Sequence, residues 1–172
     1  SDLLQAADAW SYVEADVHAH IQERDYARAA QRIADVRDSL AQFAHSEHVS
    51  AQTAVLARLS DTLLREVQPV LAAAITSGDV DAMELCAAVY ARLQQDDALA
   101  ELYLPARAER VHRVWADTDA TLPAKMAQLG DALVALADEE VHTFAPRLFG
   151  NEAAVVIAHT LACLLYTSPS PR

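Results

Sequence analysis

The sequence predicts an all-α protein made of antiparallel helical bundles in series. It is rich in hydrophobic residues (53%), yet only 6% of its residues are aromatic and it has only 3 glycines. Alanine and leucine lose little freedom on entering a helix, whereas a sheet protein needs more β-branched, aromatic and turn residues. Apolar residues also recur at helical spacing along nearly the whole chain. Most breaks between these segments are short, so successive helices should pack antiparallel.

Three helices are predicted before the middle of the chain. The first covers about 2–22, and the second covers about 26–44 with Asp25 as its N-cap. The third begins near Val49 and places leucines at alternating spacings of three and four, which is close to a heptad seam. Pro69 should interrupt this helix or begin a new helical piece, because proline is well tolerated only in the first turn.

A polar turn at 77–79 (Ser-Gly-Asp) separates the third predicted helix from the fourth. Its glycine suits a helix C-terminus, and its aspartate can cap the helix that follows. That helix, about 80–94, has apolar residues around most of its circumference, so we expect it at the buried centre of a bundle. We predict one helical segment over 1–165, with a possible division into two bundles near 76–79.

Two longer helices are predicted in the second half. One covers about 98–116, where Pro105 should remove a backbone hydrogen bond and kink the helix. The other covers about 122–144 and ends at Pro146 and Gly150. Its inward positions are predicted to be Leu122, Met126, Leu129, Leu133, Leu136 and Phe144.

A last helical segment follows Asn151, its predicted cap. Its uncharged apolar run, 153–166, is shorter than the roughly 20 residues that a membrane-spanning helix needs. The tail at 166–172 contains Ser-Pro-Ser-Pro, which cannot continue a helix, and we interpret it as non-native or disordered. No cationic segment followed by an apolar one lies near the start, so we see no signal peptide in this sequence.

The charge balance restricts the partners that the chain can have. Its formal charge is −12, which argues against a nucleic-acid or anionic-membrane surface, because both require clustered Lys and Arg. Cys86 and Cys163 lie far apart and have no metal-like spacing, a usage that suits a reducing compartment. We therefore predict no nucleic-acid partner.

Two Glu-x-x-His pairs are the main candidates for chemistry: Glu109 with His112, and Glu139 with His142. In carboxylate-bridged di-iron bundles, Glu and His at this spacing point inward from two helices. At about 100° per residue, however, both pairs fall outside the apolar arcs of their helices and should face solvent. We therefore predict no metal site, and a carboxylate-bridged metal bundle remains the alternative.

No other pattern predicts an active site. The chain has no glycine-rich phosphate loop and no serine in a nucleophile-elbow context. Cys86 lies among apolar residues of a helix, where burial should keep its thiol protonated and inert. His159 lies in an apolar stretch and is expected to be a hydrogen-bonded core histidine. We therefore predict no catalytic residue, no cofactor and no small-molecule substrate, and we expect that the protein is not an enzyme.

Contacts with other proteins are the remaining class of function. Tyr103, Arg107 and Trp115 could form a contact surface, because aromatic residues and arginine are enriched at binding hot spots. The alternative is that these residues fill a helix interface inside the protein. The acidic runs at 96–97 and 138–140 are interpreted as solvated faces, with docking of a basic partner as the alternative.

Three stretches of the sequence carry a family resemblance: 7–10 (Ala-Asp-Ala-Trp), 56–63 and above all 85–115, in which a tyrosine, a basic residue and a tryptophan follow one another at a fixed spacing. With this spacing matched without gaps, they resemble the family of subunit seven of the conserved oligomeric Golgi complex. The similarity continues faintly to about Ala162. Pro105 departs from the family's pattern, which puts a straight helix at that position in doubt.

This resemblance implies a fragment of a longer, rod-like subunit built of helical bundles. It also implies a peripheral protein on the cytoplasmic face of Golgi membranes, with indirect membrane association and with the other subunits of the complex as partners. Such tethers capture vesicles in retrograde transport within the Golgi. The family offers no catalytic or ligand residue to carry over. A helical scaffold of another tethering complex is the alternative.

Overall fold

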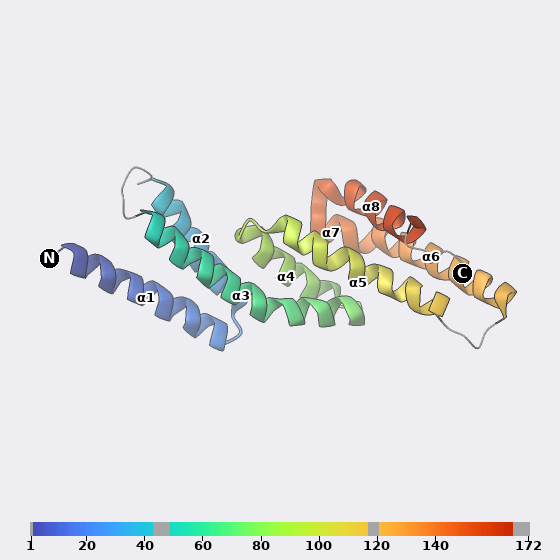
Figure 1. Cartoon of the computed structure of the whole chain (residues 1–172), viewed down its shortest axis with the longest axis horizontal. Coiled ribbons are helices and arrows are strands. Elements are labelled where there is room, and N and C mark those ends of the chain that lie inside the picture. Colours follow the sequence, from blue (N-terminus) through green and yellow to red (C-terminus); the bar gives the residue numbers. More distant parts are fainter. Residues whose placement is uncertain (1, 43–48, 117–120, 167–172) are drawn as a thin grey trace. The chain divides into compact units, whose positions relative to one another are not determined.

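The computed structural model describes residues 2–42, 49–116 and 121–166, and every regular element in these ranges is helical (Figure 1). The predicted all-α class is therefore confirmed, whereas the tail after residue 166 lies outside the described residues. The elements are α1 (Asp2–Gln22), α2 (Tyr26–Ala41), α3 (Val49–Ser77), α4 (Val80–Arg92), α5 (Asp96–Ala116), α6 (Leu122–Glu139), the π-helix η1 (Glu140–Phe144), α7 (Ala145–Phe149), the 3₁₀-helix η2 (Gly150–Glu152) and α8 (Ala153–Tyr166).

Three helix-to-helix turns share one backbone geometry. Each has one residue at positive φ: Arg24 after α1, Gly78 after α3 and Gln94 after α4. The next amide donates a hydrogen bond of 2.9–3.0 Å to a carbonyl five residues back, as in a Schellman ending. After the first turn, Asp25 caps α2 as predicted, because its carboxylate accepts a hydrogen bond from the backbone N–H of Arg28. These endings bring the chain back within three residues.

Two prolines lie inside helices that continue through them. The prediction that Pro69 interrupts the third helix is wrong, because α3 runs unbroken from Val49 to Ser77. Pro69 is exposed, so the carbonyl that loses its amide partner lies on the solvent side of the helix, where water can bind it. The helix α5 also continues through the exposed Pro105, and a kink at that residue stays a prediction.

The chain divides into two compact units that are interleaved in the sequence. Unit 1 comprises residues 1–71 and 85–96, and unit 2 comprises 72–84 and 97–172. Both α3 and α4 therefore contribute residues to each unit. The turn at 77–79 lies within unit 2, and a division of the chain into two bundles in series stays a prediction.

Unit 1 is built on the α1–α2 hairpin and on the adjoining parts of α3 and α4. The heptad-like spacing predicted for the third helix is a buried stripe, formed by Leu56, Leu59, Leu63, Val67 and Leu71. In the part of α4 that belongs to this unit, the side chains of Cys86, Ala87, Val89 and Tyr90 are buried. The prediction that α4 is buried all round is nevertheless wrong for Leu85, which is 67% exposed.

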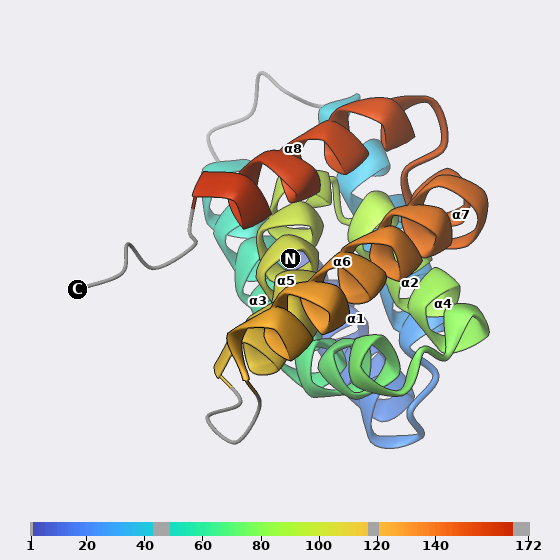
Figure 2. The same cartoon turned by 90° about the vertical axis from the view of Figure 1, so that its right-hand side faces the viewer.

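Unit 2 contains α5, α6 and the C-terminal helices. The helix α6 continues through the π-helix into α7, and α8 then folds back against α7 and η1 (Figure 2). Ala108, Val111 and Leu136 form a core cluster against which Leu129 and Leu133 pack. The inward prediction is wrong for Leu122 and Met126 at the start of α6, because both side chains are exposed. No helix in the described part of the chain has the length and apolarity to cross a membrane.

A buried tyrosine–arginine–glutamate network as candidate functional site

The first half of the network lies on one stripe of α5. Leu99, Tyr103, Arg107 and Val111 follow one another at intervals of four and are all buried. Side chains four apart lie on the same face of a helix, so a phenol and a guanidinium are held between two aliphatic residues. The apolar neighbours exclude water, and the two polar groups therefore need partners within the protein.

The second half lies where α6 passes into the π-helix. Glu140 is four residues after the buried Leu136 and four before the buried Phe144, so it occupies the inner face. Its side chain is 1% exposed, whereas that of Asp138 is 74% exposed. The interpretation of 138–140 as a solvated face is therefore wrong at Glu140. The spacing from Leu136 was the signal in the sequence that identifies this inward carboxylate.

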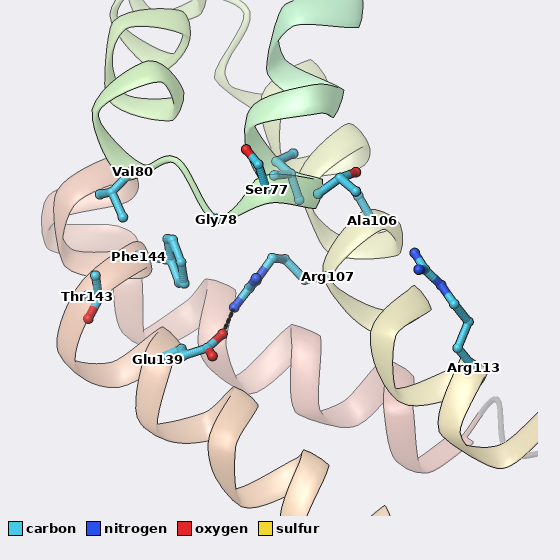
Figure 3. A pocket seen from close by; sticks show the side chains of 11 residues that line it. Ser77, Gly78, Val80, Ala106, Arg107, Arg113, Glu139, Thr143 and Phe144 are labelled. Atoms are coloured by element: carbon cyan, nitrogen blue, oxygen red, sulfur yellow. Dashed lines mark hydrogen bonds and ion pairs between the residues drawn. The ribbon is translucent and has the colours of Figure 1, made fainter.

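Glu140 is bonded through both of its carboxylate oxygens. Tyr103 Oη donates to Oε2 at 2.6 Å, and Arg107 Nε donates to Oε1 at 2.6 Å. Arg107 Nη2 donates to Glu139 Oε2 at 2.7 Å, the interaction drawn as a dashed line in Figure 3. Hydrogen bonds between charged groups are short and about twice as strong as neutral ones. The network therefore fastens α5 to the junction of α6 and η1.

Two aromatic rings enclose the polar groups. The guanidinium carbon of Arg107 lies 4.2 Å from the centroid of the Phe144 ring, a cation–π contact. The rings of Tyr103 and Phe149 meet edge to face, with centroids 5.3 Å apart. The network therefore also holds the π-helix and α7 against α5.

The electrostatics of the network keep its phenol neutral and its guanidinium charged. Burial raises the pKa of Tyr103 far above its ordinary value, and the neighbouring charge of Glu140 raises it further. Burial acts to lower the pKa of Arg107, but hydrogen bonds to Glu139 and Glu140 outweigh it and leave that pKa raised. At neutral pH the network therefore joins a neutral phenol and a charged guanidinium to the carboxyl groups of Glu139 and Glu140.

A cavity of about 620 Å³ borders the network within unit 2. Figure 3 shows Arg107 and Glu139 beside it, together with Phe144 and the end of α3 at Ser77. Arg113, farther along α5, also lines the cavity, and its Nε lies 3.6 Å from Glu109 Oε1. Arg107 lines this cavity while its guanidinium is bound by two carboxylates.

The three residues proposed as a contact surface are placed differently from one another. Tyr103 and Arg107 are buried inside unit 2 and bind Glu140, which corresponds to the alternative of an internal helix interface. Trp115 belongs to α5, but its side chain is outside the part that the structure describes. A role of these residues in contacts with another protein stays a prediction.

The prediction that both Glu-x-x-His pairs face solvent holds for one residue of each pair. Glu109 and His142 are exposed as predicted, whereas His112 is half-buried and Glu139 is half-buried and binds Arg107. In the described ranges, no group of three or more His, Cys, Asp or Glu side chains is placed to hold a metal ion. His159, which was expected in the core, is exposed. Burial raises the pKa of the Cys86 thiol, as its apolar surroundings predicted.

Comparison with known proteins identifies relatives over the whole chain. The family described as Golgi complex component 7 (COG7) matches residues 1–170. The chain is 23% identical over 175 residues to the conserved oligomeric Golgi complex subunit 7 of Bos taurus, and 24% identical over 176 residues to that of Homo sapiens. These matches cover 98% and 99% of this chain but 23% of each relative. No solved structure matches the chain significantly.

The resemblance noted from the sequence is thus confirmed over almost its full length. The chain spans about a quarter of the length of these relatives, so it corresponds to one part of a longer subunit. This chain belongs to the Golgi complex component 7 family.

Proposed function

We propose that this chain is part of a structural subunit of a multisubunit vesicle tether. In this role it acts in retrograde transport within the Golgi, on the cytoplasmic face of the membrane and through contacts with other subunits. The observation that carries the proposal is the family match over residues 1–170. Its relatives are named as subunits of the conserved oligomeric Golgi complex.

The buried network is consistent with a structural role. The phenol and the guanidinium on α5 donate hydrogen bonds of 2.6–2.7 Å to the carboxylates of Glu139 on α6 and Glu140 on η1. An enzyme instead exposes such groups to a substrate, with pKa values near the working pH. We therefore propose that the segment functions as a shaped helical surface and not as a catalyst.

Affinity purification of the tagged full-length protein from its own cells tests this proposal. We expect the other subunits of the oligomeric Golgi complex to co-purify, and an unrelated tagged Golgi-associated protein serves as the control. Recovery of subunits of a different tether would favour the alternative of a helical scaffold for that complex. Recovery of the protein as a lone monomer would contradict both proposals.

Elemental analysis of the same preparation separates the remaining alternative. A carboxylate-bridged bundle would retain iron or manganese in a fixed ratio to protein. We expect no fixed ratio, because Glu139 is bound to Arg107 and His142 is exposed. Stoichiometric metal that disappears in a Glu139→Gln, His142→Ala variant would support the metal-binding alternative.

A further inference from the structure

The helix α6 and the start of the π-helix η1 carry a second apolar face besides the one that packs into unit 2. Starting at Ala127, apolar or small residues recur at alternating intervals of three and four, which is the spacing of a helix-packing seam. We call this face the outer seam; it consists of Ala127, Gly130, Val134 and Ala137 on α6 and of Val141 in the adjoining π-helix η1. All of these residues are exposed except Ala137, which is half-buried.

Gly130 in the outer seam faces open space in the part of unit 2 that the structure describes. A Cβ added at this position would meet nothing within 4 Å, and the φ angle is not positive. Glycine in a helix interior is less favourable than alanine by about 1 kcal/mol. Neither packing in this unit nor backbone geometry explains that cost. A small residue at the centre of a seam does allow the backbone of a second helix to approach closely.

Acidic side chains border the exposed flank of the outer seam. Asp131 and Asp138 each follow a seam residue directly, seven residues apart, and both are exposed. These are the positions that set partner choice in paired helices. The opposite flank turns toward the core, where Leu133 is partly buried and Glu140 is buried. Only the acidic flank is therefore open to a partner.

We propose that the outer seam is a docking site for an amphipathic helix whose aliphatic stripe is bordered by Lys or Arg. Val134 and Val141 would fill the spaces between its aliphatic side chains, while Asp131 and Asp138 would pair with its basic residues. An anionic membrane fits less well, because the aspartates would repel it. An antiparallel second copy would bring its own aspartates against them. The inference rests on the proposed function and names the chemistry of one subunit contact.

Binding of designed helical peptides to the full-length protein tests this docking site directly. Each peptide has about four heptads with leucine at the seam, and carries either Lys or Glu at both flanking positions, which keeps it monomeric through self-repulsion. We expect the Lys peptide to bind at least about tenfold more tightly than the Glu peptide by fluorescence anisotropy. A scrambled Lys peptide of the same composition controls for attraction to an acidic protein. Equal binding of all three peptides would overturn the proposal.

Matched variants identify the site. Val134 in the outer seam and Val155 on α8 are both 70% exposed, so Val134→Asp and Val155→Asp add the same charge at equal burial. We expect Val134→Asp to weaken Lys-peptide binding about tenfold and Val155→Asp to change it less than about twofold. Circular dichroism and thermal melting verify that both variants fold. Similar effects of the two variants would contradict the assigned site.

Two further variants test the charge and the close approach. Asp131→Lys combined with Asp138→Lys should reverse the preference from the Lys peptide to the Glu peptide, because the flanking pairs then change sign. Gly130→Leu should weaken binding of the Lys peptide, because the larger side chain would occupy the space that the docked helix needs. It should not lower the melting temperature, because a Cβ at this position would meet nothing within 4 Å in the unit. An unchanged preference, or unchanged binding by Gly130→Leu, would contradict the proposal.

The purification of the tether separates this inference from the proposed function. Loss of one subunit from the Val134→Asp protein, with the rest retained, would support both. If the Val134→Asp protein retains every subunit and still binds the Lys peptide, the docking site at the outer seam is contradicted and the proposed function is not. If the wild-type protein instead binds anionic phospholipid vesicles or self-associates, and Val134→Asp abolishes that property, the proposed partner is contradicted.

Discussion

Tyr103 and Glu140, 37 residues apart in the sequence, share a hydrogen bond of 2.6 Å in the interior of unit 2. Arg107 binds the other oxygen of the same carboxylate at the same distance. A buried charge is tolerated when it is paired and hydrogen-bonded, and it becomes costly when a partner is removed. The stability of this unit should therefore depend strongly on these side chains.

Glu140→Ala should lower the free energy of unfolding by about 3–5 kcal/mol, because it leaves Arg107 buried with one carboxylate partner instead of two. Urea denaturation followed by circular dichroism measures the change. Asp138→Ala, two residues away on the exposed side, should change it by less than about 0.5 kcal/mol. Equal effects of the two substitutions would mean that the network contributes no net stability.

Tyr103→Phe should weaken the pH dependence of stability in alkaline solution. The pKa of Tyr103 is raised in the folded state, so the folded protein holds the phenolic proton more tightly than the unfolded chain. This stabilisation is fully present below about pH 10, the ordinary tyrosine pKa, and is lost as the pH rises toward the folded value. Stability measured from pH 8 to 11 should fall less steeply in Tyr103→Phe than in the wild type. Tyr12→Phe removes a phenol from an exposed position and serves as the matched control.

Arg24→Gly and Gln94→Gly should each stabilise the protein by about 0.5–1 kcal/mol. Both positions have a left-handed backbone conformation, which costs a residue with a Cβ about 1–2 kcal/mol and which glycine adopts freely. The reverse change, Gly78→Ala, should destabilise it by a similar amount. Thermal melting of the three single variants tests the set. A fall in melting temperature for both new glycines would show that the side chains stabilise these turns in another way.

Leu63→Ala should destabilise unit 1 by about 2–5 kcal/mol, because the leucine is fully buried and its removal leaves a cavity. Leu85→Ala serves as its control, since the same atoms are removed from an exposed position of the same unit. We expect this second change to cost less than about 0.5 kcal/mol. Both values come from urea denaturation of the purified chain.

Helix periodicity predicted most of the fold. It located the starts of α1, α2 and α6 and the buried stripe of α3, because apolar spacing directly reports which face of a helix is covered. It failed at Pro69, where the proline ring lies on the exposed side and the helix tolerates the lost hydrogen bond. It also failed at Leu122 and Met126, whose positions continue the inner stripe beyond the point where α6 is covered.

The buried network was only partly visible in the sequence. Tyr103 and Arg107 were singled out by residue type, but their partner was placed in solvent because it belongs to an acidic run. Helical phase carries more information than residue type at this position, since Glu140 is in register with Leu136 and Phe144. The π-helix that begins at Glu140 has no strong signature in local composition.

The interleaving of the two units determines the order in which a growing chain can complete them. Residues 72–84 belong to unit 2 but leave the ribosome before 85–96, which unit 1 requires. Domains usually fold in the order of their synthesis. Here unit 1 is complete only after Asp96 has left the ribosome. By then, residues 72–84 of unit 2 have already emerged. A truncation placed at the turn of Gly78 would leave unit 1 without Tyr90 and Leu93, two of its buried side chains.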